Sequence, residues 1–177
     1  YKFLKERPFI DFYIKSDGEY AFVRLVKKLI DLGLDVKKFK TDFSKLPNIC
    51  YVKDEKYVEG PYERVEDLMA VPSPYVMGLM DKFFELKLMP TIQTNRGCPY
   101  HCTFCADGHF SNRKIHRKSD EYMREELEYI AKRVKLSPTL AFCDLNFGMY
   151  KQDIETAKII RDIRKKYQWP DQMYGST

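Results

Sequence analysis

The stretch that decides the fold is PTIQTNRGCPYHCTFC, residues 90–105. Its opening segment, 90–94, predicts a short strand that runs directly into Cys98, Cys102 and Cys105. The C-x3-C-x2-C spacing packs three soft thiolate ligands into eight residues, close enough to bind one metal centre together. The sequence therefore predicts a metal-binding loop at the carboxyl end of a strand.

Downstream of this loop, helices and strands alternate. Ser119 predicts a helix start, because this short polar residue is followed by two acidic residues. The apolar face of this helix is predicted to consist of Met123, Leu127, Ile130, Ala131 and Val134. A strand is predicted over 139–143. A second helix follows with an apolar face of Ile154, Ala157, Ile160 and Ile163, and a third strand is predicted over 173–176.

This order predicts an α/β fold with parallel strands joined by right-handed crossovers. In such sheets ligands bind at the carboxyl ends of the strands. The cysteine stretch, 144–148 and 175–177 all lie at that end. We therefore expect these segments to form one rim.

The first half predicts a strand over Phe9–Ile14, a polar turn at 16–19 and a helix that ends at Gly33. Residues 48–60 predict a hairpin around a polar turn. The proline-rich stretch 60–90 is interpreted as a connecting segment with one short helix from Tyr75 to Leu86. We place a domain boundary near this segment.

Composition is that of an ordinary globular chain, with 44% hydrophobic and 32% charged residues among 177. The net charge of +5 is spread over helical stretches, which disfavours a nucleic-acid footprint. The sequence contains no apolar run of membrane-spanning length and no signal-peptide pattern. Because the chain begins at Tyr1 and ends within a predicted strand, we expect a segment of a longer polypeptide.

The five cysteines are an odd number, which together with the missing secretory signal disfavours a disulfide framework and favours a reducing compartment, the cytoplasm. Cys50 and Cys143 are flanked by apolar residues and are interpreted as buried structural thiols. The cysteine motif itself has three interpretations. A zinc site would need a fourth ligand such as His101, His109 or His116. A redox pair would use Cys102 and Cys105 and leave Cys98 idle, whereas an iron–sulfur cluster uses all three.

The motif resembles the signature of radical S-adenosylmethionine (radical SAM) enzymes, C-x3-C-x-aromatic-C, with Phe104 at the aromatic position. The segment 144–148, DLNFG, is similar to a "DxNF" segment in the subgroup whose radical domain follows a cobalamin-binding domain. Residues 10–19 resemble the last strand and the "GEGE"-type turn of that domain, and 72–75 resemble its linker. Two departures are the turn sequence Ser-Asp-Gly-Glu and the lack of the histidine motif that ligates cobalt.

The resemblance implies an α/β chain that contains the end of a Rossmann-like cobalamin-binding-type domain and the first part of a (β/α) TIM-like barrel. The implied division is 1–47 for the cobalamin-type part, 48–89 for the hairpin and linker, and 90–177 for the radical SAM barrel. The implied cofactors are a [4Fe–4S] cluster on Cys98, Cys102 and Cys105, and SAM. Cobalamin is left open, because this segment lacks its binding motif.

The implied activity is reductive cleavage of SAM to a 5′-deoxyadenosyl radical under oxygen-free conditions, for methylation, cyclisation or rearrangement of an unknown small molecule. An electron donor such as flavodoxin or ferredoxin is implied, and no catalytic residue is assigned. The alternative is a non-catalytic iron–sulfur or zinc-binding module, which a metal analysis would distinguish.

The resemblance also implies roles for individual residues, each with a structural alternative. Phe104 is placed near the SAM adenine, or else in the core. Asp144 and Asn146 are placed at the SAM amino group, or else in a helix-start cap. Ser176 is placed near the ribose. Arg117 and Lys118 are placed at the SAM carboxylate, or else on a solvated surface.

Overall fold

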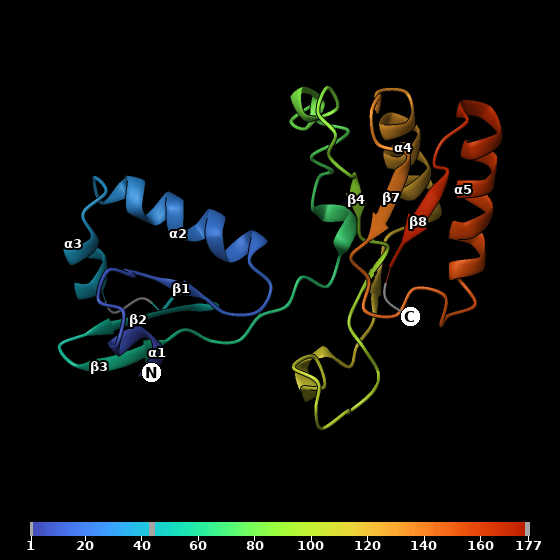
Figure 1. The fold of residues 1–177 in the computed structure, drawn as a ribbon. Coiled ribbons are helices and arrows are strands. Elements are labelled where there is room, and N and C mark those ends of the chain that lie inside the picture. Colours follow the sequence, from blue (N-terminus) through green and yellow to red (C-terminus); the bar gives the residue numbers. More distant parts are fainter. Residues whose placement is uncertain (1, 43–44, 176–177) are drawn as a thin grey trace. The chain divides into compact units, whose positions relative to one another are not determined.

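The computed structural model describes residues 2–42 and 45–175 (Figure 1). Two compact units divide the chain, Tyr1–Glu66 and Asp67–Thr177, and each is described by itself. Both units combine helices with strands, so the predicted α/β class is confirmed. None of the helices in the described ranges is long and apolar enough to cross a membrane.

The first unit is a three-stranded antiparallel sheet of order β1-β2-β3 with helices beside it. Its elements are α1 (Lys2–Lys5), β1 (Tyr13–Ile14), α2 (Glu19–Asp31), α3 (Val36–Thr41), β2 (Ile49–Lys53) and β3 (Lys56–Glu59). The hairpin is confirmed, because Asp54 and Glu55 form a two-residue turn with φ of 47° and 60°. The helix end is confirmed too, since Gly33 follows α2 with φ of 68°.

The strand predicted over Phe9–Ile14 is wrong for most of its length. Only Tyr13 and Ile14 pair with β2, through Cys50 and Ile49. The Ile10 N–H instead donates to the Arg7 carbonyl at 3.0 Å, and the Phe9 side chain is 80% exposed. The Ile10 N–H is therefore used in a local turn and is not available for pairing in a longer strand.

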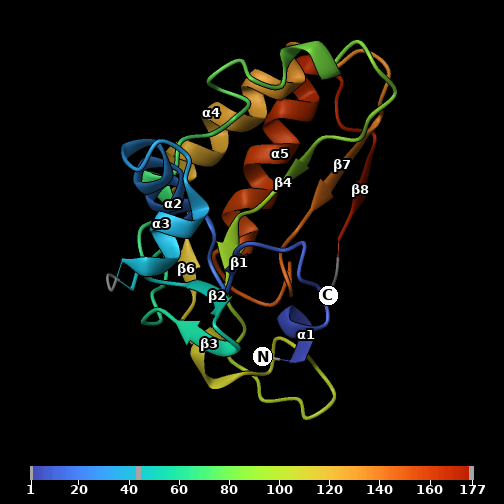
Figure 2. The same cartoon turned by 90° about the vertical axis from the view of Figure 1, so that its left-hand side faces the viewer.

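The second unit is built on a parallel sheet of order β4-β7-β8, as the strand–helix order predicted. Its strands are β4 (Thr91–Ile92), β7 (Thr139–Phe142) and β8 (Gln172–Tyr174), and its long helices are α4 (Asp120–Ala131) and α5 (Asp153–Tyr167). The shorter elements are η1 (Leu68–Ala70), η2 (Asp81–Phe83), β5 (Asn95–Arg96), η3 (Phe110–Asn112) and β6 (His116–Arg117). Both long helices cover the same face of the sheet (Figures 1 and 2). Continuation into a barrel stays a prediction.

The core between the sheet and its helices differs from the predicted one at α5. Ile154 is 57% exposed and Ala157 is exposed, whereas Thr156, Ile159, Ile160 and Ile163 are buried together with Asp153. The burial of Ile160 and Ile163 is thus confirmed, and the rest of the buried face is displaced from the predicted one. The prediction of a buried Cys143 is also wrong: Leu140 and Phe142 belong to the core, and strand alternation turns the next side chain away from it.

The helix predicted from Tyr75 to Leu86 is wrong. Gly78 adopts φ of 74°, which ends the first turn, and the only helical element of this stretch in the described chain is the short η2. Tyr75 instead packs in the core, and its hydroxyl accepts from the Thr91 N–H at 2.9 Å and donates to the Thr91 carbonyl at 3.1 Å.

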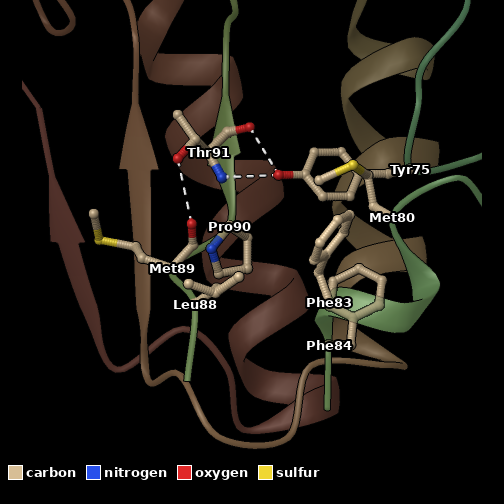
Figure 3. A pocket seen from close by; sticks show the side chains of 8 residues that line it. All are labelled: Tyr75, Met80, Phe83, Phe84, Leu88, Met89, Pro90 and Thr91. Atoms are coloured by element: carbon tan, nitrogen blue, oxygen red, sulfur yellow. Dashed lines mark hydrogen bonds between the residues drawn. The ribbon is translucent and has the colours of Figure 1, made fainter. Parts of the chain in front are cut away.

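These two bonds cap the free edge of β4. The neighbouring strand β7 is bonded to the Pro90 and Ile92 carbonyls, so the backbone groups of Thr91 face the other way. An apolar pocket of about 350 Å³ lies beside this contact, lined by Tyr75, Met80, Phe83, Phe84, Leu88, Met89, Pro90 and Thr91 (Figure 3). It opens at the amino end of β4, the opposite end of the strand from the cysteines.

Candidate functional site

The cysteine loop, residues 97–115, is closed at its base by the antiparallel pair β5 and β6. Asn95 pairs with Arg117 and Arg96 with His116, and the Lys118 N–H donates to the Thr94 carbonyl at 3.0 Å. Inside this ladder the Cys98 N–H donates to the Asn112 carbonyl at 2.8 Å. The first cysteine is therefore held at a fixed place just beyond the end of β4.

The three predicted metal ligands share this loop and differ in exposure. All three are free thiols; Cys98 is half-buried, and Cys102 and Cys105 are exposed. Among residues 2–42 and 45–175, no group of three or more His, Cys, Asp or Glu side chains converges in a way that could hold a metal ion. The structure thus places the thiols on one loop without gathering them into a ligand cage.

The donor chemistry of the loop nevertheless fits an iron–sulfur cluster. Three unpaired thiols offer the soft ligands that such clusters take, and the two exposed ones are open to an incoming group. Gly108 winds the loop tightly, because a Cβ there would lie 2.5 Å from the Cys102 carbonyl oxygen. The Cys105 N–H donates to the same carbonyl at 3.0 Å, which makes a turn between the second and third cysteines.

The side chains between the cysteines point away from the core. Phe104 is 91% exposed, so its alternative role as a core aromatic is wrong, while its place beside adenine stays a prediction. His101 Nδ1 lies 3.4 Å from the Gly108 carbonyl oxygen, and His109 Nδ1 accepts from the Ser111 N–H at 3.3 Å. Both histidines therefore make hydrogen bonds within the loop.

Asp144 lies at the carboxyl end of β7 and is only 2% exposed. Its Oδ1 accepts from the Thr94 N–H at 2.8 Å and the Asn95 N–H at 3.2 Å, and its Oδ2 accepts from the Thr94 hydroxyl at 2.5 Å. Burial raises the pKa of this carboxyl above its ordinary value, although these bonds act in the opposite direction. Asp144 thus fastens the end of β7 to the strand that leads into the cysteine loop. Its predicted contact with the SAM amino group stays a prediction.

Asn146 brings the second predicted segment to the cysteines. Its Nδ2 donates to the Cys98 sulfur at 3.3 Å, which joins the β7–α5 loop, residues 143–152, to the first ligand. Ser176, predicted near the ribose, lies outside the described residues. The structure therefore unites the cysteine loop and the β7–α5 loop at one rim, as the parallel sheet predicted.

Arg117 belongs to a further polar cluster at this rim, whose other members, Asp153 and Tyr150, were not predicted from the sequence. Asp153 is buried at the start of α5, where its Oδ2 accepts from the Gly148 and Tyr150 N–H groups at 2.9 and 3.0 Å. Its Oδ1 accepts from Arg117 Nη1 at 3.0 Å, and the guanidinium of Arg117 lies 4.4 Å from the centre of the Tyr150 ring. Acidic residues at helix starts are common, so no local pattern indicates that this one is buried.

Two atoms of this cluster are unsatisfied. The buried Nη2 of Arg117 and the buried hydroxyl of Tyr150 have no hydrogen-bond partner among the described residues. Burial also raises the pKa of Tyr150 above its ordinary value of 10.0, although the positive charge of Arg117 acts in the opposite direction. Arg117 is therefore no solvated surface charge, and it presents a buried donor near the cysteine loop.

No protein-family model matches the chain. Two curated relatives are methyltransferases. One, 2-(S-pantetheinyl)-carbapenam-3-carboxylate methyltransferase of Streptantibioticus cattleyicolor, is 31% identical over 170 residues, which cover 92% of this chain and 24% of the relative. The other, the cobalamin-dependent radical SAM methyltransferase TokK of Streptomyces tokunonensis, is 30% identical over 179 residues, 97% of this chain and 25% of the relative. The chain thus spans about a quarter of the length of these relatives.

Among solved structures, the chain is similar to the cobalamin-dependent S-adenosylmethionine radical enzyme OxsB with aqua-cobalamin and S-adenosylmethionine bound. The match has a TM-score of 0.59 at 26% identity and covers 93% of this chain and 22% of OxsB. It extends over both compact units, as the two curated matches do. The chain therefore belongs to the radical SAM superfamily, within the subgroup that carries an N-terminal cobalamin-binding-type domain.

Proposed function

We propose that the protein is a radical SAM enzyme whose [4Fe–4S] cluster is bound by Cys98, Cys102 and Cys105. The observation that carries the proposal is the set of three free thiols on one loop, fixed at the carboxyl end of β4. When bound, the cluster and SAM supply reductive cleavage of SAM and thereby radical chemistry. The strands β5 and β6 hold the base of the cysteine loop, and the Asn146 amide donates a hydrogen bond to the Cys98 sulfur.

The second ligand of the proposed site is SAM. The 91% exposure of Phe104 supports a role beside the adenine, because an aromatic face on this loop is free to stack. The unpartnered Nη2 of Arg117 supports a contact with the SAM carboxylate. Asp144 is proposed to hold the rim in place, since its carboxylate already accepts three bonds, and Ser176 remains proposed near the ribose.

Metal analysis of protein reconstituted without oxygen tests the cluster. We expect about four irons and about four sulfides per chain, as in a [4Fe–4S] centre. Replacing Cys98, Cys102 or Cys105 by alanine should lower the iron content, whereas Cys143→Ala, which removes an exposed thiol outside the motif, should leave it unchanged. Stoichiometric zinc without iron would overturn the proposal in favour of a non-catalytic metal-binding module.

For the whole protein we propose methyl transfer to a small molecule with cobalamin as a second cofactor. The support is the description of TokK as a cobalamin-dependent radical SAM methyltransferase and the presence of cobalamin in OxsB. Cyclisation and rearrangement are the other reaction types that the resemblance implies. Full-length protein should bind added hydroxocobalamin, seen in its absorbance spectrum, and should release 5′-deoxyadenosine from SAM. Failure to bind cobalamin would shift the proposal to cyclisation or rearrangement.

The cluster also needs an electron source, for which we propose a flavodoxin or ferredoxin in the cytoplasm. The five free thiols support a reducing compartment. SAM cleavage by the full-length protein should proceed with reduced flavodoxin in place of dithionite. Cleavage that proceeds with dithionite but with neither reduced flavodoxin nor reduced ferredoxin would contradict this choice of donor.

A further inference from the structure

The contact between Asn146 and Cys98 links an uncharged side chain to a proposed cluster ligand. The amide Nδ2 lies 3.3 Å from the sulfur, a normal distance for an N–H···S bond. Cys98 is the half-buried member of the motif, whereas Cys102 and Cys105 are exposed. A sulfur bound to iron as a thiolate has no proton to donate, so the reverse orientation of the amide would place its carbonyl oxygen against another electron-rich atom. The donor orientation is therefore the favourable one.

The segment around Asn146 is fixed on both sides. Two residues earlier, Asp144 is bonded to Thr94 and Asn95 at the start of the cysteine loop. Further along, Asp153 accepts from the N–H groups of Gly148 and Tyr150 and is paired with Arg117 of β6. The amide is thus held at the sulfur by anchors that attach to the base of the same loop.

Such a bond has a defined effect on an iron–sulfur centre. Hydrogen bonds to the sulfurs are one of the factors that set the reduction potential of a cluster, because they stabilise negative charge on sulfur. Reduction adds one electron to the cluster, so a donor at a ligand sulfur favours the reduced state. Removing the donor should therefore lower the potential.

We propose that Asn146 is a positioning residue whose N–H···S bond to Cys98 raises the reduction potential of the cluster. This inference rests on the proposed function, because it needs the cluster on Cys98. It gives Asn146 a role at the metal ligand, in addition to the SAM contact that the resemblance implies. The electron itself comes from the external donor, and the amide is neither oxidised nor reduced.

The test is a potentiometric titration, followed by electron paramagnetic resonance, of full-length protein reconstituted without oxygen. Asn146→Leu keeps the shape and removes the amide without adding charge, and Asn146→Ala removes it with less bulk. Both should shift the potential to lower values while the iron content stays at that of the wild type. Gln152→Leu is the matched control, because this exposed amide belongs to the same β7–α5 loop as Asn146 and makes no side-chain hydrogen bond to the start of α5. Its potential should stay at the wild-type value.

The outcomes separate the inference from the proposed function. Unchanged potentials in both Asn146 variants with intact clusters would overturn the inference and leave the cluster itself standing. Loss of iron from both variants, with Gln152→Leu fully loaded, would overturn the tuning role in favour of a role in cluster assembly. Absence of iron from the wild type would instead overturn the proposed function.

Discussion

The cysteine loop presents two of its thiols and an aromatic ring to solvent, whereas Asp144 of the β7–α5 loop and Asp153 at the start of α5 use their carboxylates in hydrogen bonds. Cys102, Cys105 and Phe104 are exposed. Asp144 and Asp153 are buried and accept three bonds each. One loop therefore keeps its groups available for a ligand, and the other supports it. Substitutions in the cysteine loop should therefore reduce cofactor binding, whereas substitutions of Asp144 and Asp153 should reduce stability.

The largest effect is expected at Asp144. Asp144→Ala leaves two N–H groups and one hydroxyl without their acceptor in a buried place, which we expect to lower the free energy of unfolding by about 3 kcal/mol. Denaturant unfolding at neutral pH measures this loss. Asp171→Ala is the control, because that carboxylate is 62% exposed, and it should change stability by less than about 0.5 kcal/mol. Equal effects of the two substitutions would mean that Asp144 does not fasten the strands.

The second largest loss of stability is expected at Asp153, and it should exceed the loss at its ion-pair partner Arg117. Asp153→Ala frees two backbone N–H groups and leaves Arg117 unpaired, at an expected cost of about 2 kcal/mol. Arg117→Ala should cost about 1 kcal/mol, because Asp153 keeps both backbone partners. Denaturant unfolding of the two variants gives the comparison. A larger loss for Arg117→Ala would show that the ion pair, not the backbone bonds, holds the loop.

The general division into strands and helices was predictable from the sequence because it depends on local patterns. The strand before the cysteines, the cap at Ser119 and the spacing of apolar residues in α4 are all short-range signals, and the structure has each of these elements. The C-x3-C-x2-C motif is equally local. These features needed no knowledge of tertiary contacts.

The supporting contacts could not be predicted, because their partners are distant in sequence. Asp144 bonds to residues about fifty positions earlier, and Asp153 pairs with Arg117 thirty-six positions away. Glu126 was likewise missed: it is buried in α4, where it accepts from Ser73 at 2.6 Å and from Lys118 at 3.3 Å. An acidic residue on a helix is normally exposed, so only the tertiary structure shows that these carboxylates are interior.

A pair of glycines, one in each loop, sharpens the comparison further. Gly97 and Gly148 both have positive φ, 117° and 95°, which strains any other residue. A Cβ at Gly97 would also lie 2.6 Å from the Lys114 carbonyl oxygen, whereas a Cβ at Gly148 meets nothing within 4 Å. Gly97→Ala should therefore destabilise more than Gly148→Ala, by about 1 kcal/mol. Denaturant unfolding of both variants tests this difference. An equal loss in the free energy of unfolding at Gly148 and Gly97 would show that the positive φ alone determines the loss.

The smallest effect is expected in the pH dependence of stability. Burial raises the pKa of Asp144 above its ordinary value of 3.8, so the folded protein keeps this proton at pH values where the unfolded chain has released it. The stabilising contribution of the proton is complete below the ordinary value. It is lost as the pH rises through the pKa of the folded state.

Asp144→Asn keeps the side-chain shape and does not titrate at this position, so it isolates the contribution of the carboxyl. The free energy of unfolding of the wild type, relative to that of Asp144→Asn, should fall as the pH rises from about 4 through the raised pKa, and then become constant. Unfolding by urea at a series of pH values measures this difference. A rise over the same interval would mean that the three hydrogen bonds to the carboxylate outweigh its burial. Asp144 would then stabilise the rim most strongly in its charged form.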